Sequence, residues 1–164
     1  EIGDMPFDYG KLRWLAGAED ALTTLAGRGH TLCLLTSYDD TVFPDKADHL
    51  QVSRFFTPDR IRVLPGKKTA QDFTLVSGDT DPVVHPARCY AIGNGESDIL
   101  PALTLGHHWH GVCIPHGSTS KYLEDKGAQD SPVPPPLNYF MPPVIEHPRV
   151  TTIRRISEVA DLIG

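Results

Sequence analysis

Short apolar runs alternate with helix-like segments along most of the chain. Near its start, residues 17–28 place Ala18, Leu22 and Leu25 at helical spacing, and glycines then act as stop signals. Residues 31–36, TLCLLT, form a mainly apolar run of the kind found in strands that are buried on both faces of a parallel sheet. The pattern therefore predicts a helix followed by a buried strand.

The same alternation continues to residue 115. Further buried strands are predicted at residues 61–64 (IRVL), 89–93 (CYAIG) and 110–115 (HGVCIP). The helices expected between them cover residues 43–52, the stretch from about residue 70, and residues 97–105. Thr69 and Asp72 have the spacing of a capping box at the second of these helices. Alternating strands and helices are typical of an α/β, Rossmann-like domain with a mostly parallel sheet flanked by helices.

The stretch after residue 117 departs from this alternation. Residues 131–149 are rich in proline, with seven prolines from Pro132 to Pro148. Proline interrupts a helix and cannot donate a hydrogen bond within a central strand. We therefore expect an irregular segment that packs against the domain or a protein partner, followed by a C-terminal helix opened by Ser157. The whole chain, residues 1–164, is predicted to be a single domain.

Composition narrows the classes of partner and location. The formal net charge is −6, which disfavours nucleic acid as a partner. No apolar run approaches the roughly 20 residues of a membrane span, and the first ten residues do not resemble a signal peptide. The three cysteines form no CxxC pair, so the sequence indicates neither a disulfide framework nor a zinc ribbon. We expect a soluble, cytoplasmic protein with no membrane association.

Histidines gather near the last predicted buried strand. They are His107, His108, His110 and His116, with Cys113 among them. Their spacing matches no common zinc motif, and side chains that alternate along a strand point to opposite faces. Packing is therefore expected here rather than metal binding.

Polar residues follow three of the predicted strands, at the point where each strand ends. They are Thr36 and Ser37, then Lys67 and Lys68, then the loop from Gly93 to Asp98. The carboxyl ends of parallel strands meet at one edge of a sheet, so these residues are expected to lie together. Hydroxyls and a lysine can hold phosphate oxygens, and the side-chain oxygens of Asn94, Glu96 and Asp98 can hold Mg²⁺ weakly.

Each of these residues also has a plainer interpretation. Thr36 can simply end a strand, and the two lysines can be a solvated pair. Asp98 can serve only to favour the dipole of the following helix, an effect of about 0.3–1 kcal/mol. The sequence leaves open which of Lys67 and Lys68 would contact a phosphate.

The order of these strand-end residues resembles the haloacid dehalogenase-like (HAD-like) hydrolases. In that family a strand ends in Thr or Ser, a Lys precedes a later helix, and an acidic loop follows another strand. The text IGNGESDILPALTLG is similar to a subgroup whose loop reads GNS-x-x-SDI-x-PA, and the resemblance covers roughly residues 17–116. It implies a HAD-type fold and Mg²⁺-dependent hydrolysis of small phosphate esters through an aspartyl-phosphate.

The chain departs from the family pattern in two places. Catalysis in the family begins with a DxDx(T/V) motif ahead of the region that starts at Gly17, and its first Asp attacks phosphorus. Only Asp4 and Asp8 precede Gly17, in a different pattern and with no apolar strand before them. Asn94 replaces the first Asp of the acidic loop, which removes one negative charge from the metal site.

Two functional hypotheses follow. The first is a HAD-like phosphohydrolase domain, truncated or degenerate because its nucleophilic Asp motif is missing, in which no residue is assigned as catalytic. The second is a catalytically inactive HAD-fold protein that serves as an interaction or assembly module, with residues 131–149 as the surface for a protein partner.

Overall fold

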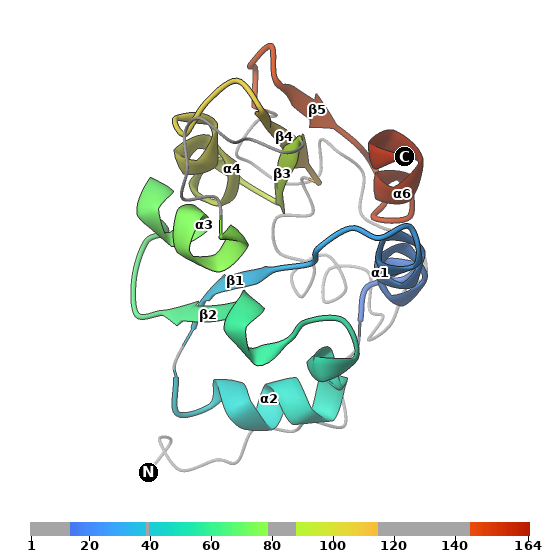
Figure 1. Ribbon diagram of the computed structural model, residues 1–164, viewed down its shortest axis with the longest axis vertical. Coiled ribbons are helices and arrows are strands. Elements are labelled where there is room, and N and C mark those ends of the chain that lie inside the picture. The colour runs from blue at the N-terminus through green and yellow to red at the C-terminus, as the bar shows by residue number, and fades with distance from the viewer. Residues whose placement is uncertain (1–13, 39, 79–87, 115–144) are drawn as a thin grey trace, which may run out of the picture.

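The structure is a computed structural model that describes residues 14–38, 40–78, 88–114 and 145–164 (Figure 1). The strands are β1 (Leu34–Ser37), β2 (Ile61–Leu64), β3 (Cys89–Gly93), β4 (Trp109–Cys113) and β5 (Val150–Thr152). The helices are α1 (Ala18–Gly27), α2 (Phe43–Leu50), α3 (Ala70–Ser77), α4 (Glu96–Leu103) and α6 (Glu158–Ile163), with short 3₁₀ turns η3 (Val52–Arg54) and η4 (Pro58–Arg60).

All strand pairs among the described residues are parallel, and they form two sheets. One sheet pairs β1 with β2, so that Leu34 lies opposite Ile61. The other has the order β3-β4-β5, with Gly111 of β4 opposite Val150 of β5. Helices α3 and α4 lie on one side of the strands, and α1 and α6 lie on the other (Figure 1). This architecture confirms the α/β, Rossmann-like fold with parallel strands flanked by helices.

Two apolar clusters hold the layers together. The cluster toward α3 and α4 contains Phe73, Ile99 and Trp109, and Leu35 of β1 packs against it. The cluster toward α1 and α6 contains Leu25, Val112 and Val159. Because side chains alternate along β4, its Trp109 and Val112 enter opposite clusters, which is the arrangement expected of a strand with helices on both faces.

Most of the predicted elements are confirmed, and their bounds differ by a few residues. The capping box at α3 is present: the backbone N–H and the hydroxyl of Thr69 both donate to Asp72 Oδ2, each at 2.8 Å. Ser157 does precede α6, but its side chain makes no capping hydrogen bond. Strand β5 was not expected from the sequence, because three residues are too short to show a period. Most of residues 131–149 lie outside the described residues. Residues 145–149 are described, and Ile145 is buried in the cluster that contains Phe73, Ile99 and Trp109.

The described helices include none that is both long and apolar enough to span a membrane.

Candidate functional site

An ion pair joins the segments that follow two different strands. Lys68 lies after β2 and just before α3, and its Nζ donates to Oδ1 of Asp98 in the first turn of α4. The two side chains are 14% and 19% exposed, so each is largely removed from water. Because β2 and β3 belong to different sheets, this contact shows that the carboxyl ends of both sheets meet at one edge. Ligands of open α/β sheets bind at such an edge.

The structure places the two adjacent lysines in different environments. Lys68 is half-buried and contacts Asp98, whereas Lys67 is exposed. Extended backbone sends consecutive side chains in opposite directions, so one of two adjacent lysines faces the sheet edge and the other faces water. Lys68 is therefore the lysine that lies at the strand ends, paired there with Asp98.

Asp98 is held against the end of β3 from two sides. Its Oδ2 accepts a hydrogen bond from the backbone N–H of Asn94 at 3.3 Å, while Oδ1 meets Lys68. A Cβ placed on Gly93 would lie 2.3 Å from Asp98 Cβ, a distance that real structures do not show. Glycine at the last position of β3 is thus what lets α4 begin so close to the strand and brings Asp98 to the edge.

The hydroxyl-bearing residues after β1 take different positions. Ser37 is exposed, and its Oγ donates to the carbonyl of Gly66 at 2.7 Å, which ties the end of β1 to the loop that carries Lys68. Thr36 is half-buried within β1, opposite Val63. The predicted gathering of these residues is thus partly seen: Ser37, the Lys68 loop, Asp98 and the Asn94 backbone form a connected chain. Glu96 and Asn94 are exposed at the start of α4.

One of the predicted Mg²⁺ ligands, Asp98, already contacts other groups of the chain. Within the described residues, no group of three His, Cys, Asp or Glu side chains could hold a metal ion. Of the two carboxylates in the first turn of α4, that of Glu96 is exposed and that of Asp98 pairs with the Lys68 ammonium group. Mg²⁺ retains several waters and binds through one or two carboxylates, so at Asp98 it would share the carboxylate with Lys68 or compete with it.

The histidines of the last predicted buried strand are packing residues where the structure describes them. His110 lies beside the Tyr90 ring, with centroids 5.8 Å apart, and His108 lies beside Trp109. Burial lowers the pKa of His110 below its ordinary value, and the charges of Arg88, Arg149 and His108 act in the same direction. Burial also raises the pKa of the Cys113 thiol, so that side chain behaves as a small apolar group.

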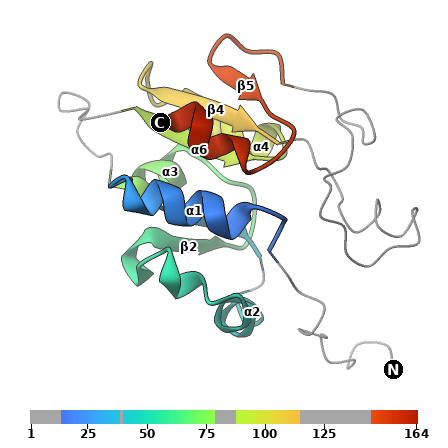
Figure 2. The ribbon, with the colours of Figure 1, turned by 90° about the vertical axis from the view of Figure 1, so that its right-hand side faces the viewer.

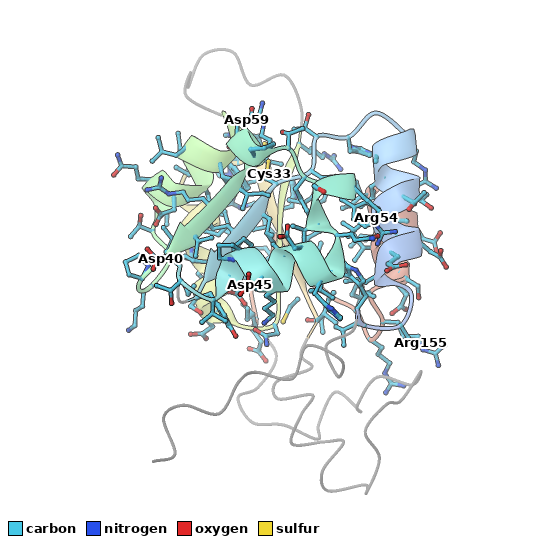
Figure 3. All side chains as sticks on the ribbon, turned by 90° about the horizontal axis from the view of Figure 1, so that it is seen from below. Cys33, Asp40, Asp45, Arg54, Asp59 and Arg155 are labelled. Carbon is cyan, nitrogen blue, oxygen red and sulfur yellow. The ribbon has the colours of Figure 1, made fainter. Side chains whose placement is uncertain are left out.

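A hollow of about 470 Å³ lies elsewhere, between the start of α1 and the end of α2. Its lining includes Trp14, His49 and Arg54, and Figure 3 shows Arg54 reaching from beyond α2 toward α1. Arg54 is paired there with Glu19 at 3.1 Å. None of the strand-end residues lines this hollow, so it does not belong to the Lys68–Asp98 edge.

One sequence feature was missed. Residues 79–83 read Asp-Thr-Asp-Pro-Val, which has the literal DxDxV spacing. A search for the text of the motif alone would have found it. The segment begins two residues after the end of α3, whereas the family motif follows a buried strand, and it lies outside the described residues. We therefore assign it no role from its text.

No protein-family model matches the sequence, and no curated protein matches it significantly. Solved structures do resemble the fold. A haloacid dehalogenase-like family hydrolase from Xanthomonas campestris matches with a TM-score of 0.59 and 20% identity, over 91% of this chain and 49% of that one. A protein from Thermotoga maritima described as a beta-phosphoglucomutase matches with a TM-score of 0.53 and 16% identity, over 89% of this chain and 57% of that one.

The chain thus spans about half the length of the solved structures that it resembles. At these identities the likeness concerns the fold, and it agrees with the arrangement of parallel strands and strand-end residues described above. The protein has the fold of the HAD-like hydrolases.

Proposed function

We propose that this chain forms the phosphate-binding edge of a HAD-like phosphohydrolase domain, with Lys68 as the residue that neutralises the phosphate. The observation that carries the proposal is the Lys68–Asp98 ion pair, which places a largely buried lysine at the carboxyl ends of the strands. A lysine is a compact cation that binds phosphate well. The backbone N–H groups at the start of α4 add a partial positive charge at the same edge.

Asp98 acts as the competitor of the phosphate in this arrangement. Lys68 must leave Oδ1 of Asp98, or share it, before it can donate fully to an anion. A carboxylate next to the anion also repels it, because like charges at short distance are unfavourable. Phosphate binding is therefore expected to be weak in the wild-type chain and to improve when the charge of Asp98 is removed.

Hydrolysis requires more than this edge. A phosphate ester needs a nucleophile and a proton donor for its leaving group. Neither is assigned to a described residue, so we propose that the 164-residue chain binds phosphate without turning over esters. No step is routed through Mg²⁺, and its binding by Asn94, Glu96 and Asp98 stays a prediction, as does a cytoplasmic location.

The test measures inorganic phosphate binding by calorimetry in four forms of the chain. Lys68→Met should weaken binding about tenfold or more, since a hydrogen bond to a charged group is worth about 1.5–3 kcal/mol. Lys67→Met is the matched control and should change affinity by less than about twofold, because an exposed charge is well screened. Asp98→Asn should strengthen binding and should do so without Mg²⁺.

Two results would contradict the proposal. One is an equal loss for both lysine variants, which would indicate a diffuse charge effect. The other is weaker binding by Asp98→Asn together with a requirement for Mg²⁺, which would make Asp98 a metal ligand. A separate assay tests the absence of turnover. If the wild-type chain hydrolyses p-nitrophenyl phosphate and Asp79→Asn abolishes that activity, the chain does turn over esters, and its nucleophile lies in residues 79–83.

The second hypothesis, an interaction or assembly module, stays a prediction for residues 131–149. Most of that segment is outside the described residues. Where the description resumes, Ile145 and Arg149 pack onto the domain.

A further inference from the structure

Asp72 is the one charged residue that is buried in the part of the chain that the structure describes. It is 7% exposed and lies in the first turn of α3, four residues after Lys68. A carboxylate is costly to bury unless its oxygens are paired in good geometry. The burial of Asp72 therefore indicates that the groups around it are held in a fixed arrangement.

Both carboxylate oxygens of Asp72 have partners. Oδ2 accepts from the N–H and the hydroxyl of Thr69, each at 2.8 Å, and Oδ1 accepts from Nε of Arg62 in β2 at 3.0 Å. The Asp72 N–H donates in turn to the Thr69 carbonyl at 3.1 Å. Burial acts to raise the pKa of Asp72, but the contacts with Thr69 and Arg62 outweigh it and hold that pKa below its ordinary value. The carboxylate thus links β2 to the residue that directly follows Lys68.

The bond to the Thr69 N–H also constrains Lys68. The peptide unit between these two residues is planar and contains the Cα atoms of both. A hydrogen bond that holds the Thr69 N–H therefore fixes the plane from which the Lys68 side chain departs. On the other side of Lys68, the Ser37 hydroxyl donates to the Gly66 carbonyl at 2.7 Å. Lys68 thus lies between two residues of the loop that are tied to other parts of the domain.

Helix α3 brings these contacts together with the strand ends. It packs against β2 and α4 and lies between them in both views (Figures 1 and 2). Arg62 reaches the first turn of α3 from β2, and Asp98 of α4 meets the Lys68 ammonium group. Two ion pairs, Arg62–Asp72 and Lys68–Asp98, are therefore joined through the backbone of residues 68 and 69.

We propose that Asp72 is a positioning residue for Lys68: it holds the Thr69 N–H so that the lysine stays directed at the strand ends, and Arg62 holds the carboxylate in place. Lysine has a flexible four-carbon stem, so a fixed backbone removes part of the entropy lost when its ammonium group binds an anion. This role rests on the phosphate binding proposed for Lys68, but the order of the lysine side chain can be measured without phosphate.

NMR of the free chain with ¹⁵N-labelled lysine is the first test, because it reports the order parameter of each ammonium group. Asp72→Ala should lower the order parameter of Lys68 toward that of Lys67, which is exposed and serves as the reference. Asp72→Glu should restore it, since Glu is the usual residue at this position of a capping box. An unchanged Lys68 order parameter in Asp72→Ala would overturn the proposal.

A second variant separates positioning from a general loss of α3. Val76 lies on the same helix and is 5% exposed, so Val76→Ala should destabilise α3 by leaving a cavity. It removes no contact of Thr69, and the Lys68 order parameter should stay at its wild-type value. If Val76→Ala lowers that order parameter as much as Asp72→Ala does, the stability of α3 is the cause and the positioning role is wrong.

Two arginines give a matched pair for the contribution from β2. Arg62 contacts Asp72 near the start of α3, whereas Arg60 donates to the Val76 carbonyl near the end of the same helix, at 3.2 Å. Their side chains are 41% and 30% exposed. Arg62→Met should lower the Lys68 order parameter, though less than Asp72→Ala does, because Thr69 keeps its bonds to Asp72. Arg60→Met should leave it unchanged, and equal effects would refute the role of Arg62.

Phosphate affinity then tests whether Asp72 acts through Lys68. Calorimetry with inorganic phosphate uses the Asp98→Asn chain, in which no carboxylate at position 98 competes for the lysine. Asp72→Ala should weaken binding about fivefold, the effect of releasing the backbone of one residue, and Asp72→Glu should recover most of it. In a chain that also carries Lys68→Met, Asp72→Ala should change affinity by less than about twofold. An equal loss with and without the lysine would overturn the positioning role.

The two readouts distinguish failure of this proposal from failure of phosphate binding. If Lys68→Met leaves phosphate affinity unchanged while Asp72→Ala still lowers the Lys68 order parameter, phosphate binding by Lys68 is wrong and the positioning of its side chain stands. If Lys68→Met weakens binding but Asp72→Ala changes neither readout, phosphate binding stands and the role of Asp72 is overturned.

Discussion

Lys67 and Lys68 are adjacent in the sequence, yet only one of them contacts the strand-end carboxylate of Asp98. The sequence could predict that a lysine would reach the strand ends, because two lysines follow an apolar run and precede a capping box. It could not say which one, since that depends on the direction of the backbone as it leaves β2. The structure places Lys68 against Asp98 and leaves Lys67 exposed.

Gly93→Ala tests the close approach on which this contact depends. The new Cβ would meet Asp98 at 2.3 Å, and overpacking of this kind costs about 1–3 kcal/mol. We expect urea denaturation to show a loss in that range, and the Lys68–Asp98 contact to loosen. Gly66→Ala is the control: nothing lies within 4 Å of its Cβ, so its effect should stay below about 0.5 kcal/mol. Equal losses would contradict the steric account.

At the scale of elements, the apolar periodicity of the sequence predicted the helices and the strands β1 to β4, but it did not predict the short strand β5. The helices and strands β1 to β4 follow the predicted order, because each has an apolar run or a helical stripe of its own. Strand β5 has three residues, Val150–Thr152, and exists through its pairing with β4. Pairing of this kind between distant residues leaves no local pattern to read.

Asp72→Ala tests the capping box of α3. Asp72 is buried, which acts to raise its pKa, but the Thr69 N–H and hydroxyl and the Arg62 guanidinium outweigh burial and hold the pKa below its ordinary value. Loss of a cap costs about 0.5–2 kcal/mol at neutral pH. Because the folded pKa is depressed, this contribution is present above the unfolded value near 3.9 and fades as the pH falls through the folded value.

The measurement for this prediction is urea unfolding of wild type and variant from pH 7 to pH 3. The difference between them should shrink below about pH 4. Asp20→Ala is the matched control, since Asp20 has the same third position in α1, where Gly17 offers no side-chain cap. It should lose only about 0.3–1 kcal/mol of helix-dipole stabilisation. A constant Asp72→Ala difference across this range would refute the charge-based cap.

At the scale of the whole molecule, contacts between distant segments complete the fold. Arg149 precedes β5, and its guanidinium donates to the carbonyls of Gly106, Trp109 and Leu103 at 2.5, 2.9 and 2.9 Å. These carbonyls belong to the end of α4 and the turn into β4. A planar guanidinium with five donors suits such a cluster, and no other residue type does.

Arg149→Met should therefore cost about 3 kcal/mol in urea unfolding, because it strips carbonyl groups of a charged donor. Arg154→Met is the control: Arg154 is exposed, and a change below about 0.5 kcal/mol is expected. A second readout is the pKa of His110. Burial lowers this pKa most, the charge of Arg88 comes next, and the charge of Arg149 also contributes. That pKa should rise in the variant, and a fall or no change would contradict the contact.

The sequence by itself determined the order of the elements, the α/β class and the residue types at the strand ends, because apolar periodicity and capping are local properties. The tertiary structure decided which lysine meets Asp98, why Gly93 must be glycine, and how the carboxyl ends of β2 and β3 come to lie together. Those features depend on distances between segments that lie far apart in the chain. Such distances arise when the layers pack, and no local pattern encodes them.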